Sequence, residues 1–535
     1  MSGRTVEGTR SQNKLKIYNT ITKHKEELKI EGFFFKWYTC GPTVYDSAHI
    51  GHARSYITLD IIRKTLERYF GYNITYIMNI TDIDDKIIVK ANEFLNNLPK
   101  DISEEFNKLS IKLAEDTEEQ KRIHMATRAV SRKFEKEFFE DMAALGVDLP
   151  NYTTRVSDYV DEIIKFIIGI EERGYAYESE GSVYFDVQKY REAYKYPLMC
   201  SASTQEDQQS LLEEGEGKLT LGQKNRKEDF VLWKASKKGE PAWASKWGAG
   251  RPGWHIECSA MASNIAGGRI DMHSGGIDLM FPHHDNEIAQ SEGYGLNNWV
   301  GHFLHTGHLH IEGMKMSKSL KNFIKVEELL KKGTARELRL MFILQRYSGP
   351  MTYNEESLER AKVMDKKIFR YISLHTACTK TDSINAVHPF TDAEKSIMEE
   401  FENTAMEIDK AIKDDFNFPK ALKFAVELAS MEAKTNVKEI HQQIAMYLRR
   451  LMHNIGLEAE EEASTSDQTG LIELIGSFRN KIRDLTKSSS DKKAYFEACD
   501  AVRKEMEEKG FVIEDGNGQA ASSLRKKVLD APYKH

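Results

Sequence analysis

The run Phe33-Phe-Phe-Lys-Trp-Tyr-Thr-Cys40 is rich in aromatic residues and stops at Gly41-Pro42. A helical pattern follows from Ser47 to Phe70. A second apolar run, Tyr72-Asn-Ile-Thr-Tyr-Ile-Met-Asn-Ile80, again leads into a helical segment that starts at Asp84. Strands and helices that alternate at this spacing predict a parallel α/β sheet.

The alternation breaks after this point and returns about 150 residues later. Residues 95–145 are charged and helical in pattern, Val156–Arg173 is an amphipathic helix, and Tyr175–Val187 reads as a hairpin. A polar stretch at 201–228 is expected to be a surface loop. We expect the α/β pattern to resume at Asp229–Trp233 and to continue through two further runs, Arg269–Phe281 and Trp299–Ile311. A sheet interrupted in this way implies a domain inserted into a nucleotide-binding fold, followed by an almost wholly helical remainder from Val326.

The composition excludes several classes of protein. The chain has 535 residues, 40% hydrophobic and 30% charged, which is typical of a globular protein with sizeable cores. The net charge of −7 excludes a broadly basic nucleic-acid coat, although a local basic track stays open. No apolar run long enough to span a membrane occurs, and the first ten residues lack a signal-type apolar core. Five scattered cysteines indicate a reducing, cytoplasmic setting.

Two short motifs flank the interrupted sheet, His49-Ile-Gly-His52 and Lys315-Met-Ser-Lys-Ser319. A helix N-terminus directly after a parallel strand favours phosphate, because its free amide groups and its dipole both attract anions. Gly51 leaves room for a purine near the backbone. The lysines would stabilise charge on a phosphoryl oxygen. Either motif alone could occur by chance, whereas the pair in this order is far more specific.

A second group of residues has metal-ligand chemistry. In Phe281-Pro-His-His-Asp-Asn-Glu287, His283 and Glu287 fall at i and i+4 on one helix face. Cys258 would be a third ligand and Cys40 a fourth, and two thiolates favour zinc over magnesium or calcium. The alternative, that Cys40 and Cys258 are ordinary buried thiols, stays open on spacing alone. We expect the remaining cysteines to be ordinary ones: Cys200, Cys378 and Cys499.

Two acidic stretches are ambiguous. Gly275 and Gly276, followed by Asp278, could admit a nucleoside and bind its ribose hydroxyls, but glycine pairs also mark tight turns. The carboxylates of Thr81-Asp-Ile-Asp-Asp-Lys86 could bind magnesium, yet helix N-capping is the favoured interpretation. Trp254, four residues before Cys258, could wall a small pocket.

Five segments together resemble the cysteinyl-tRNA synthetase family, which belongs to the class I aminoacyl-tRNA synthetases: Tyr38–Tyr45 leading into His49–His52, Asn79–Lys86, Gly250–Ser259, Phe281–Ser291 and Lys315–Ser319. The resemblance is dense over roughly residues 15–345 and thinner through Asp414–Asn417 and the tail Asp500–Gly518. Residues 98–132 look longer than in compact members, and 201–228 match poorly.

The resemblance implies an α/β Rossmann catalytic domain split by an α+β insertion, then an all-α anticodon-binding bundle and a small C-terminal α/β module. The corresponding boundaries are 15–95 and 229–325 for the two catalytic halves, 96–228 for the connective insertion, 326–390 for a stem-contact region, 391–465 for the anticodon-binding domain and 466–535 for the C-terminal domain.

The resemblance also implies the chemistry. Cysteine would be activated by ATP with Mg²⁺ to cysteinyl-adenylate and transferred to tRNA(Cys), with no membrane involved and the protein a monomer or dimer. Zinc would be held by Cys40, Cys258, His283 and Glu287. Thr81, Trp254 and His273 would surround the cysteine, and ATP would contact His49, Gly51, His52, Gly275, Gly276, Asp278, Lys315 and Lys318.

Two rival functions remain at this point. A ligase that transfers activated cysteine to a small amine would have little need for 200 residues beyond the lysine motif. A non-catalytic RNA-binding relative would be expected to have lost the histidine and lysine motifs, which are intact here.

Overall fold

The structure, a computed structural model, describes residues 14–30, 32–95, 106–108, 111–200, 211, 224–311, 314–315, 323–376, 391–435, 437–458, 482, 500, 511–514 and 523–526. The chain forms two compact units. The first comprises residues 1–361 and 409–421, and the second comprises 362–408 and 422–535.

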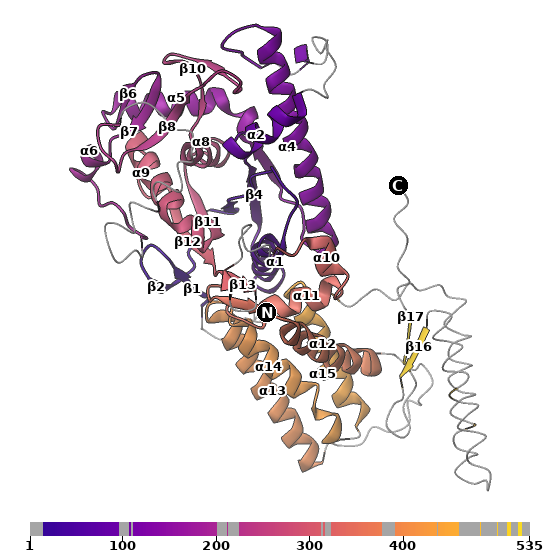
Figure 1. The fold of residues 1–535 in the computed structure, drawn as a ribbon. Coiled ribbons are helices and arrows are strands. Elements are labelled where there is room, and N and C mark those ends of the chain that lie inside the picture. The colour runs from indigo at the N-terminus through magenta and orange to yellow at the C-terminus, as the bar shows by residue number, and fades with distance from the viewer. Residues whose placement is uncertain are drawn as a thin grey trace, which may run out of the picture. The chain divides into compact units, whose positions relative to one another are not determined.

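A five-stranded parallel sheet lies in the first unit, with the strand order β12-β11-β3-β4-β5 (Figure 1). Its strands come from distant parts of the chain: β3 (Phe35–Thr39), β4 (Ile74–Ile80), β5 (Tyr152–Arg155), β11 (Ile270–Gly276) and β12 (Val300–Thr306). The central strands are almost wholly buried, as expected where helices cover both faces of a parallel sheet. The predicted parallel α/β sheet, interrupted by an insertion, is therefore confirmed.

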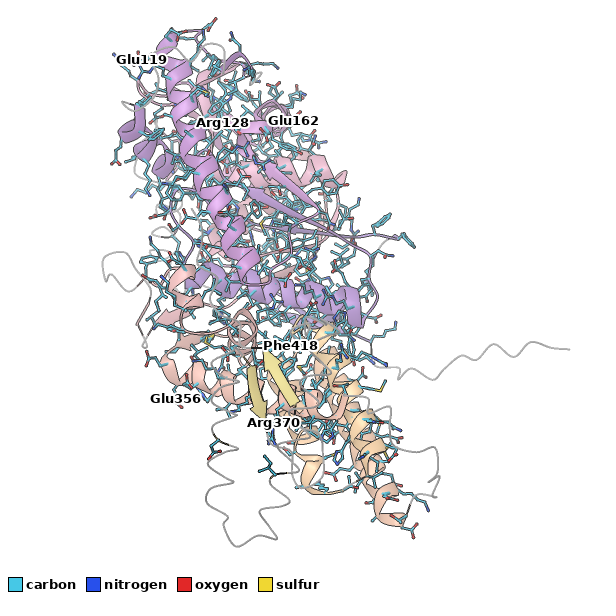
Figure 2. The ribbon with its side chains drawn as sticks, turned by 90° about the vertical axis from the view of Figure 1, so that its right-hand side faces the viewer. Glu119, Arg128, Glu162, Glu356, Arg370 and Phe418 are labelled. Atoms are coloured by element: carbon cyan, nitrogen blue, oxygen red, sulfur yellow. The ribbon has the colours of Figure 1, made fainter. Side chains whose placement is uncertain are left out.

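Helices connect and flank these strands: α1 (Ile50–Lys64), which continues as a π-helical turn (Thr65–Tyr69), α2 (Asp85–Phe94), α4 (Glu118–Ala144), α8 (Trp254–Ala266) and α9 (Asp285–Tyr294). Their ends follow local sequence chemistry. Thr117 caps α4 through the amide of Gln120, and Asp84 caps α2 through that of Lys86. The capping interpretation of the 81–86 stretch thus holds for Asp84. Figure 2 shows the length of α4, along which Glu119 and Arg128 lie.

A second, antiparallel sheet has the order β6-β7-β8-β10-β9. It consists of β6 (Ala176–Ser179), β7 (Ser182–Phe185), β8 (Phe230–Ala235), β9 (Trp243–Ser245) and β10 (Gly248–Pro252), accompanied by a 3-10 turn (Val156–Asp158), α5 (Val160–Glu172) and α6 (Val187–Arg191). The hairpin expected at 175–187 is present as β6 and β7. The expectation that the parallel pattern resumes at Asp229–Trp233 is wrong, because β8 pairs antiparallel with β7 and β10. The parallel sheet resumes at β11.

Smaller elements complete the first unit. An N-terminal hairpin is formed by β1 (Lys16–Asn19) and β2 (His24–Glu27). A three-stranded sheet in the order β14-β13-β15 carries the start of the lysine motif; its strands are β13 (Leu309–Ile311), β14 (Met314–Lys315) and β15 (Met351–Tyr353). The unit also contains a 3-10 turn (Ile277–Leu279), a π-helical turn (Met280–His284), α10 (Val326–Leu330) and α11 (Ala335–Ile343).

The rest of the described chain is mainly helical, as expected: α12 (Glu355–Thr376), α13 (Asp392–Lys413), α14 (Phe418–Leu428), a 3-10 turn (Met431–Ala433) and α15 (Lys438–Asn454). A hairpin of β16 (Phe511–Glu514) and β17 (Ser523–Lys526) lies near the C-terminus. Within the described ranges, no helix has the length and apolar character needed to cross a membrane.

Candidate metal centre and active site

The predicted site residues meet at the carboxyl edge of the parallel sheet. Cys40 directly follows β3, Thr81 directly follows β4, and Gly275 and Gly276 end β11. The register aligns these ends, because Thr39 pairs with both Met78 and Ser274. Ligands of open α/β sheets bind at this edge.

Gly41 lets the backbone after Cys40 pass very close to the neighbouring strand. Its amide donates to Asn79 Oδ1 at 2.8 Å. A Cβ atom at this position would lie 1.6 Å from the carbonyl oxygen of Asn79, which is a severe clash. Glycine is therefore required here for the thiol of Cys40 to reach its position.

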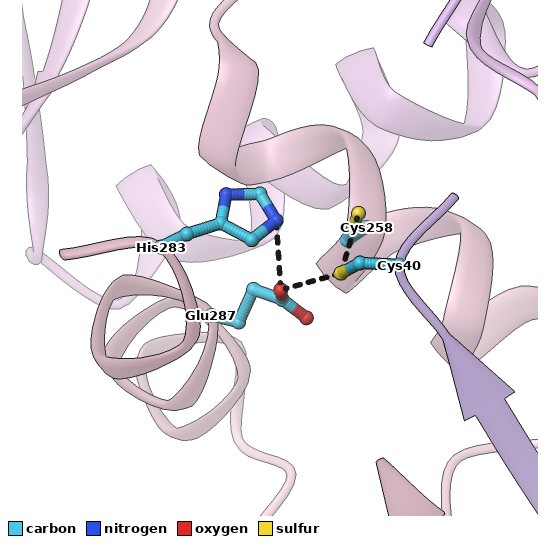
Figure 3. A group of neighbouring side chains, drawn as sticks. All are labelled: Cys40, Cys258, His283 and Glu287. Carbon is cyan, nitrogen blue, oxygen red and sulfur yellow. Dashed lines mark hydrogen bonds and ion pairs between the residues drawn. The ribbon is translucent and has the colours of Figure 1, made fainter. Parts of the chain in front are cut away.

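The structure brings together the four predicted metal ligands (Figure 3). Their ligand atoms all lie within 4.8 Å of one another, and all four side chains are buried. His283 Nε2 and Glu287 Oε1 are 3.0 Å apart across one helical turn, as the i, i+4 spacing predicted. Cys258, in the second turn of α8, places its Sγ 3.8 Å from that of Cys40.

This donor set fits zinc. Two sulfurs bound at the usual Zn–S distance of about 2.3 Å in a tetrahedral site lie about 3.8 Å apart, which matches the separation of the two thiols. Two sulfurs, one imidazole and one carboxylate are borderline-soft donors, which disfavours magnesium and calcium. The residues therefore fit a zinc ion without rearrangement of the sulfur pair.

The electrostatics of the cluster also favour a cation. Burial raises the pKa of Glu287, but His273 and His283 outweigh that effect and lower the pKa to about 2. A hydrogen bond with Cys40 lowers the pKa of Cys258, while burial raises the pKa of Cys40. Burial lowers the pKa of His283, but Glu287 and Cys258 outweigh that effect and raise it to about 10. The His283 imidazolium thus compensates the negative charge of the buried carboxylate and thiolate, a role that a bound cation would take over.

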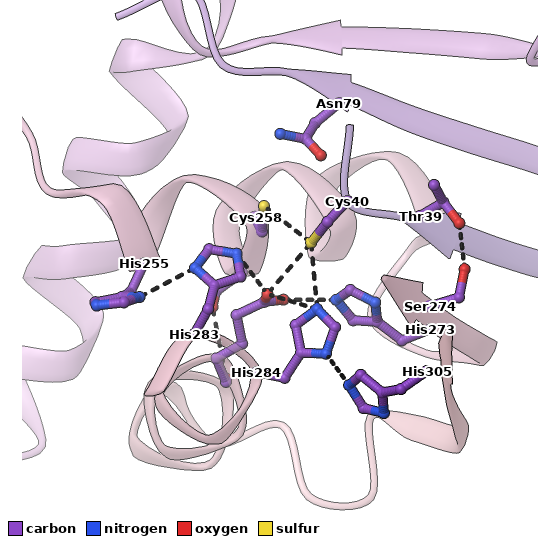
Figure 4. Close-up of polar contacts among 12 residues, drawn as sticks. Thr39, Cys40, Asn79, His255, Cys258, His273, Ser274, His283, His284 and His305 are labelled. Carbon is purple, nitrogen blue, oxygen red and sulfur yellow. Dashed lines mark hydrogen bonds and ion pairs between the residues drawn. The ribbon is translucent and has the colours of Figure 1, made fainter. Parts of the chain in front are cut away.

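Sequence reasoning missed three histidines that surround this cluster (Figure 4). His284 Nε2 lies 3.4 Å from Cys40 Sγ, and His284 Nδ1 lies 2.7 Å from His305 Nε2. His255 Nδ1 lies 3.0 Å from His283 Nδ1. A signal was present for two of them, since His284 adjoins His283 and His255 stands three residues before Cys258.

A second possible ligand set overlaps the first: Cys40, His273, His284 and Glu287. It shares Cys40 and Glu287 with the predicted set, so a single ion cannot use both sets fully. It has one thiol instead of two and is therefore the weaker match to zinc.

Two of the three residues expected around the amino acid contact the cluster directly. Trp254 stacks on the His283 ring, with centroids 4.5 Å apart and planes 24° apart. His273 Nε2 lies 2.8 Å from Glu287 Oε2. Thr81 contacts the neighbour of a ligand and not a ligand itself. Its hydroxyl donates to the carboxylate of Glu257, which precedes Cys258 in the sequence, at 3.3 Å.

The first nucleotide motif forms the N-terminus of α1. His49 is the N-cap, its Nδ1 accepts from the amides of Gly51 and His52, and the two imidazole rings stack at 3.8 Å. The chain after the lysine motif is tied to the same point, because the amide of Ile50 donates to the carbonyl of Ile324 at 2.9 Å. The described chain that follows the lysine motif therefore contacts the histidine motif at this helix end.

The remaining nucleotide residues are placed less completely. A Cβ at Gly276 would lie 2.3 Å from Asp278 Oδ1, so the glycine allows that carboxylate to fold back against the strand end. Gly275 faces His284. The backbone of Lys315 pairs with that of His310, whereas Lys318 lies outside the described residues.

Comparison with known proteins agrees with this arrangement. A family model described as the tRNA synthetases class I (C) catalytic domain matches residues 28–363. The cysteine–tRNA ligase of Encephalitozoon cuniculi is 40% identical over 523 residues, which cover 96% of this chain and 99% of that relative. The chain belongs to the cysteine–tRNA ligase family. A cytoplasmic cysteine–tRNA ligase of Dictyostelium discoideum, 39% identical, covers 92% of this chain with 75% of its own length.

Solved structures of this class share the fold. A Mycobacterium tuberculosis methionyl-tRNA synthetase in complex with methionyl-adenylate superposes with a TM-score of 0.53 at 13% identity. The match covers 79% of this chain and 90% of that structure. At this identity the likeness concerns architecture alone, and it agrees with a class I catalytic domain in this member of the ligase family.

Proposed function

We propose that the chain is a cysteine–tRNA ligase that joins L-cysteine to the 3′ end of tRNA(Cys) in two steps. The cysteine carboxylate attacks the α-phosphate of ATP, which forms cysteinyl-adenylate and releases pyrophosphate. A hydroxyl of the terminal ribose of tRNA(Cys) then attacks the adenylate, which releases AMP. The buried Cys40–Cys258–His283–Glu287 cluster, in a chain of this family that also carries a histidine-capped α1 N-terminus, supports the proposal most directly.

The cluster would hold one zinc ion through these four side chains. When bound, zinc supplies affinity for a thiolate sulfur and gains little from a neutral hydroxyl. Serine differs from cysteine by one atom, and apolar packing separates such pairs by only about 1–3 kcal/mol. The donor set therefore supports selection by sulfur chemistry, with Trp254, His273 and Thr81 shaping the space for the amino acid.

The residues of the nucleotide motifs would position ATP with its Mg²⁺. The N-terminus of α1, with His49, Gly51 and His52, is suited to the phosphate chain. Gly275 and Gly276 would allow close approach of the nucleoside, and Asp278 would accept hydrogen bonds from the ribose. Lys315 and Lys318 would stabilise charge on the phosphoryl oxygens. No protein nucleophile is needed, because positioning and electrostatic stabilisation suffice.

The proposed function assigns tRNA binding to the regions that follow the catalytic domain. The boundaries given above for the stem-contact, anticodon-binding and C-terminal regions stay predictions. The relative from Encephalitozoon cuniculi, aligned over 96% of this chain, supports a function that involves the helical C-terminal region as well. The name of the Dictyostelium discoideum relative supports a cytoplasmic location.

Two coupled assays test the proposal. Exchange of labelled pyrophosphate into ATP should require cysteine and should proceed without tRNA, and labelled cysteine should then appear on tRNA(Cys). Exchange without transfer to tRNA, but with transfer to a small amine, would support the first rival function. A chain that binds RNA and shows no exchange would support the second.

A further inference from the structure

A chain of polar contacts starts at Cys40 in the metal cluster, runs through His284 and His305, and ends at Thr20 in the N-terminal hairpin. His284 is fully buried, and its Nε2 lies 3.4 Å from Cys40 Sγ. Its Nδ1 lies 2.7 Å from Nε2 of His305, which is also buried (Figure 4). His305 Nδ1 in turn lies 2.8 Å from the hydroxyl oxygen of Thr20.

Each ring in this chain uses both of its nitrogens. A ring flip of His284 or His305 would therefore break two contacts at once, so the chain fixes the orientation of both imidazoles. A neutral imidazole donates at one nitrogen and accepts at the other, and a hydroxyl can do either. The Thr20 hydroxyl donates its one hydrogen to the Phe303 carbonyl, so it accepts from His305 Nδ1, and His305 Nε2 is left to accept from His284 Nδ1.

Thr20 is itself firmly placed. Its amide donates to the carbonyl of Phe303 at 3.1 Å, and its hydroxyl lies 3.0 Å from the same oxygen. The preceding residue, Asn19, accepts from the Phe303 amide at 3.2 Å and donates to Gly301 at 3.2 Å. These contacts hold the turn between β1 and β2 against β12, the strand that carries His305.

We propose that Thr20 is a positioning residue for the metal centre: its hydroxyl fixes His305, which holds His284 against Cys40. The inference rests on the proposed zinc site and goes beyond it, because Thr20 belongs to a hairpin outside both the parallel sheet and the ligand set. Polar groups behind metal ligands orient those ligands, and their loss typically weakens metal affinity by about 10- to 100-fold.

The test compares hydroxyl-free and hydroxyl-bearing variants of the full-length chain. Thr20→Val keeps the shape of the side chain and removes the hydroxyl, Thr20→Ala removes it without adding an atom, and Thr20→Ser keeps it. Zinc affinity is measured by competition with a chromophoric chelator. The matched control is Thr22→Val in the same hairpin, where the hydroxyl contacts only Glu26 among the described residues.

Thr20→Val and Thr20→Ala should weaken zinc binding by about 10-fold, the lower end of the range for a direct partner of a ligand, because Thr20 acts through two imidazoles. Thr20→Ser and Thr22→Val should match the wild type. At saturating zinc, the KM for cysteine should rise in the Val variant while the KM for ATP stays unchanged, a split that general loss of structure would not produce. Wild-type zinc affinity in Thr20→Val, or equal weakening in Thr20→Ser, would overturn the inference and leave the proposed function standing. A wild-type chain that binds no zinc would overturn both.

Discussion

The Sγ atoms of Cys40 and Cys258 lie 3.8 Å apart, although 218 residues separate the two cysteines in the sequence. One thiol follows the first strand of the parallel sheet, and the other lies on the helix that leads into the strand β11. The two halves of the interrupted sheet must therefore be assembled before the candidate metal site exists. A bound metal would stabilise this assembled state, because it binds the folded chain and not the separated halves.

Replacing His49 by asparagine should separate its structural role from its chemical one. Asparagine is a good N-cap, so the contacts to the amides of Gly51 and His52 are retained in kind and the free energy of unfolding should change by less than about 0.5 kcal/mol. Pyrophosphate exchange should fall on the order of 10²-fold, the scale of one electrostatic donor. His49→Ala should lose activity and also about 1 kcal/mol of stability. Undiminished exchange in His49→Asn would refute the role assigned to the imidazole.

Gly41→Ala should damage the site through the backbone. The added methyl would lie 1.6 Å from the carbonyl oxygen of Asn79, so one of the two strands must shift, at a cost of about 1–3 kcal/mol or more. We expect a lower melting temperature and weaker zinc binding. Gly349→Ala is the control, because its Cβ would meet neighbours at 3.6 Å, an ordinary contact. Equal stability of the two variants would show that the close approach at Gly41 is not required.

Asp60 should make the stability of the first unit depend on acid pH. Its carboxylate is buried, and Arg339 lies 2.6 Å and Lys64 2.8 Å away, so these cations hold its pKa below the ordinary value despite burial. A carboxyl group whose pKa is depressed by folding contributes stability above its unfolded pKa, about 3.9. This contribution is lost as the pH falls below that value and through the lower folded pKa.

Asp60→Asn should therefore cost about 3–5 kcal/mol at neutral pH, because it removes the carboxylate charge that faces the buried Arg339 guanidinium. The cost should shrink as the pH is lowered, which urea denaturation at several pH values can measure. The exposed pair of Asp161 and Lys112 supplies the control, and Asp161→Asn should cost less than about 1 kcal/mol. A cost for Asp60→Asn that is small, or that grows on acidification, would contradict the assignment.

The sequence allowed much of the fold and the site to be predicted. The ligand candidates Cys40, Cys258, His283 and Glu287 could be named because few residue types bind zinc and because their motifs follow strands or form a helical turn. The nucleotide motif at His49 could be placed because the sequence predicts a strand before it and a helix that starts at it.

Other features could not be derived from sequence. Phe230–Ala235 is a short apolar strand, and such a strand reads the same whether its neighbours run parallel or antiparallel, so its membership of the second sheet was missed. His305 and Thr20 reach the metal cluster only through ring orientation and a chain of contacts, neither of which leaves a periodic signal. Local chemistry could thus be predicted from the sequence, whereas contacts between segments far apart in the chain could not.

A zinc ion held in part by Cys40 and Cys258 would select cysteine over serine. The most direct measurement is the zinc content of the purified chain together with cysteine- and serine-dependent pyrophosphate exchange, in the wild type, Cys258→Ser and the control Cys200→Ser. We expect about one zinc per chain and strong preference for cysteine in the wild type and the control. Cys258→Ser should lose zinc and cysteine activation together. A folded, metal-free chain that still activates cysteine and rejects serine would contradict selection by zinc.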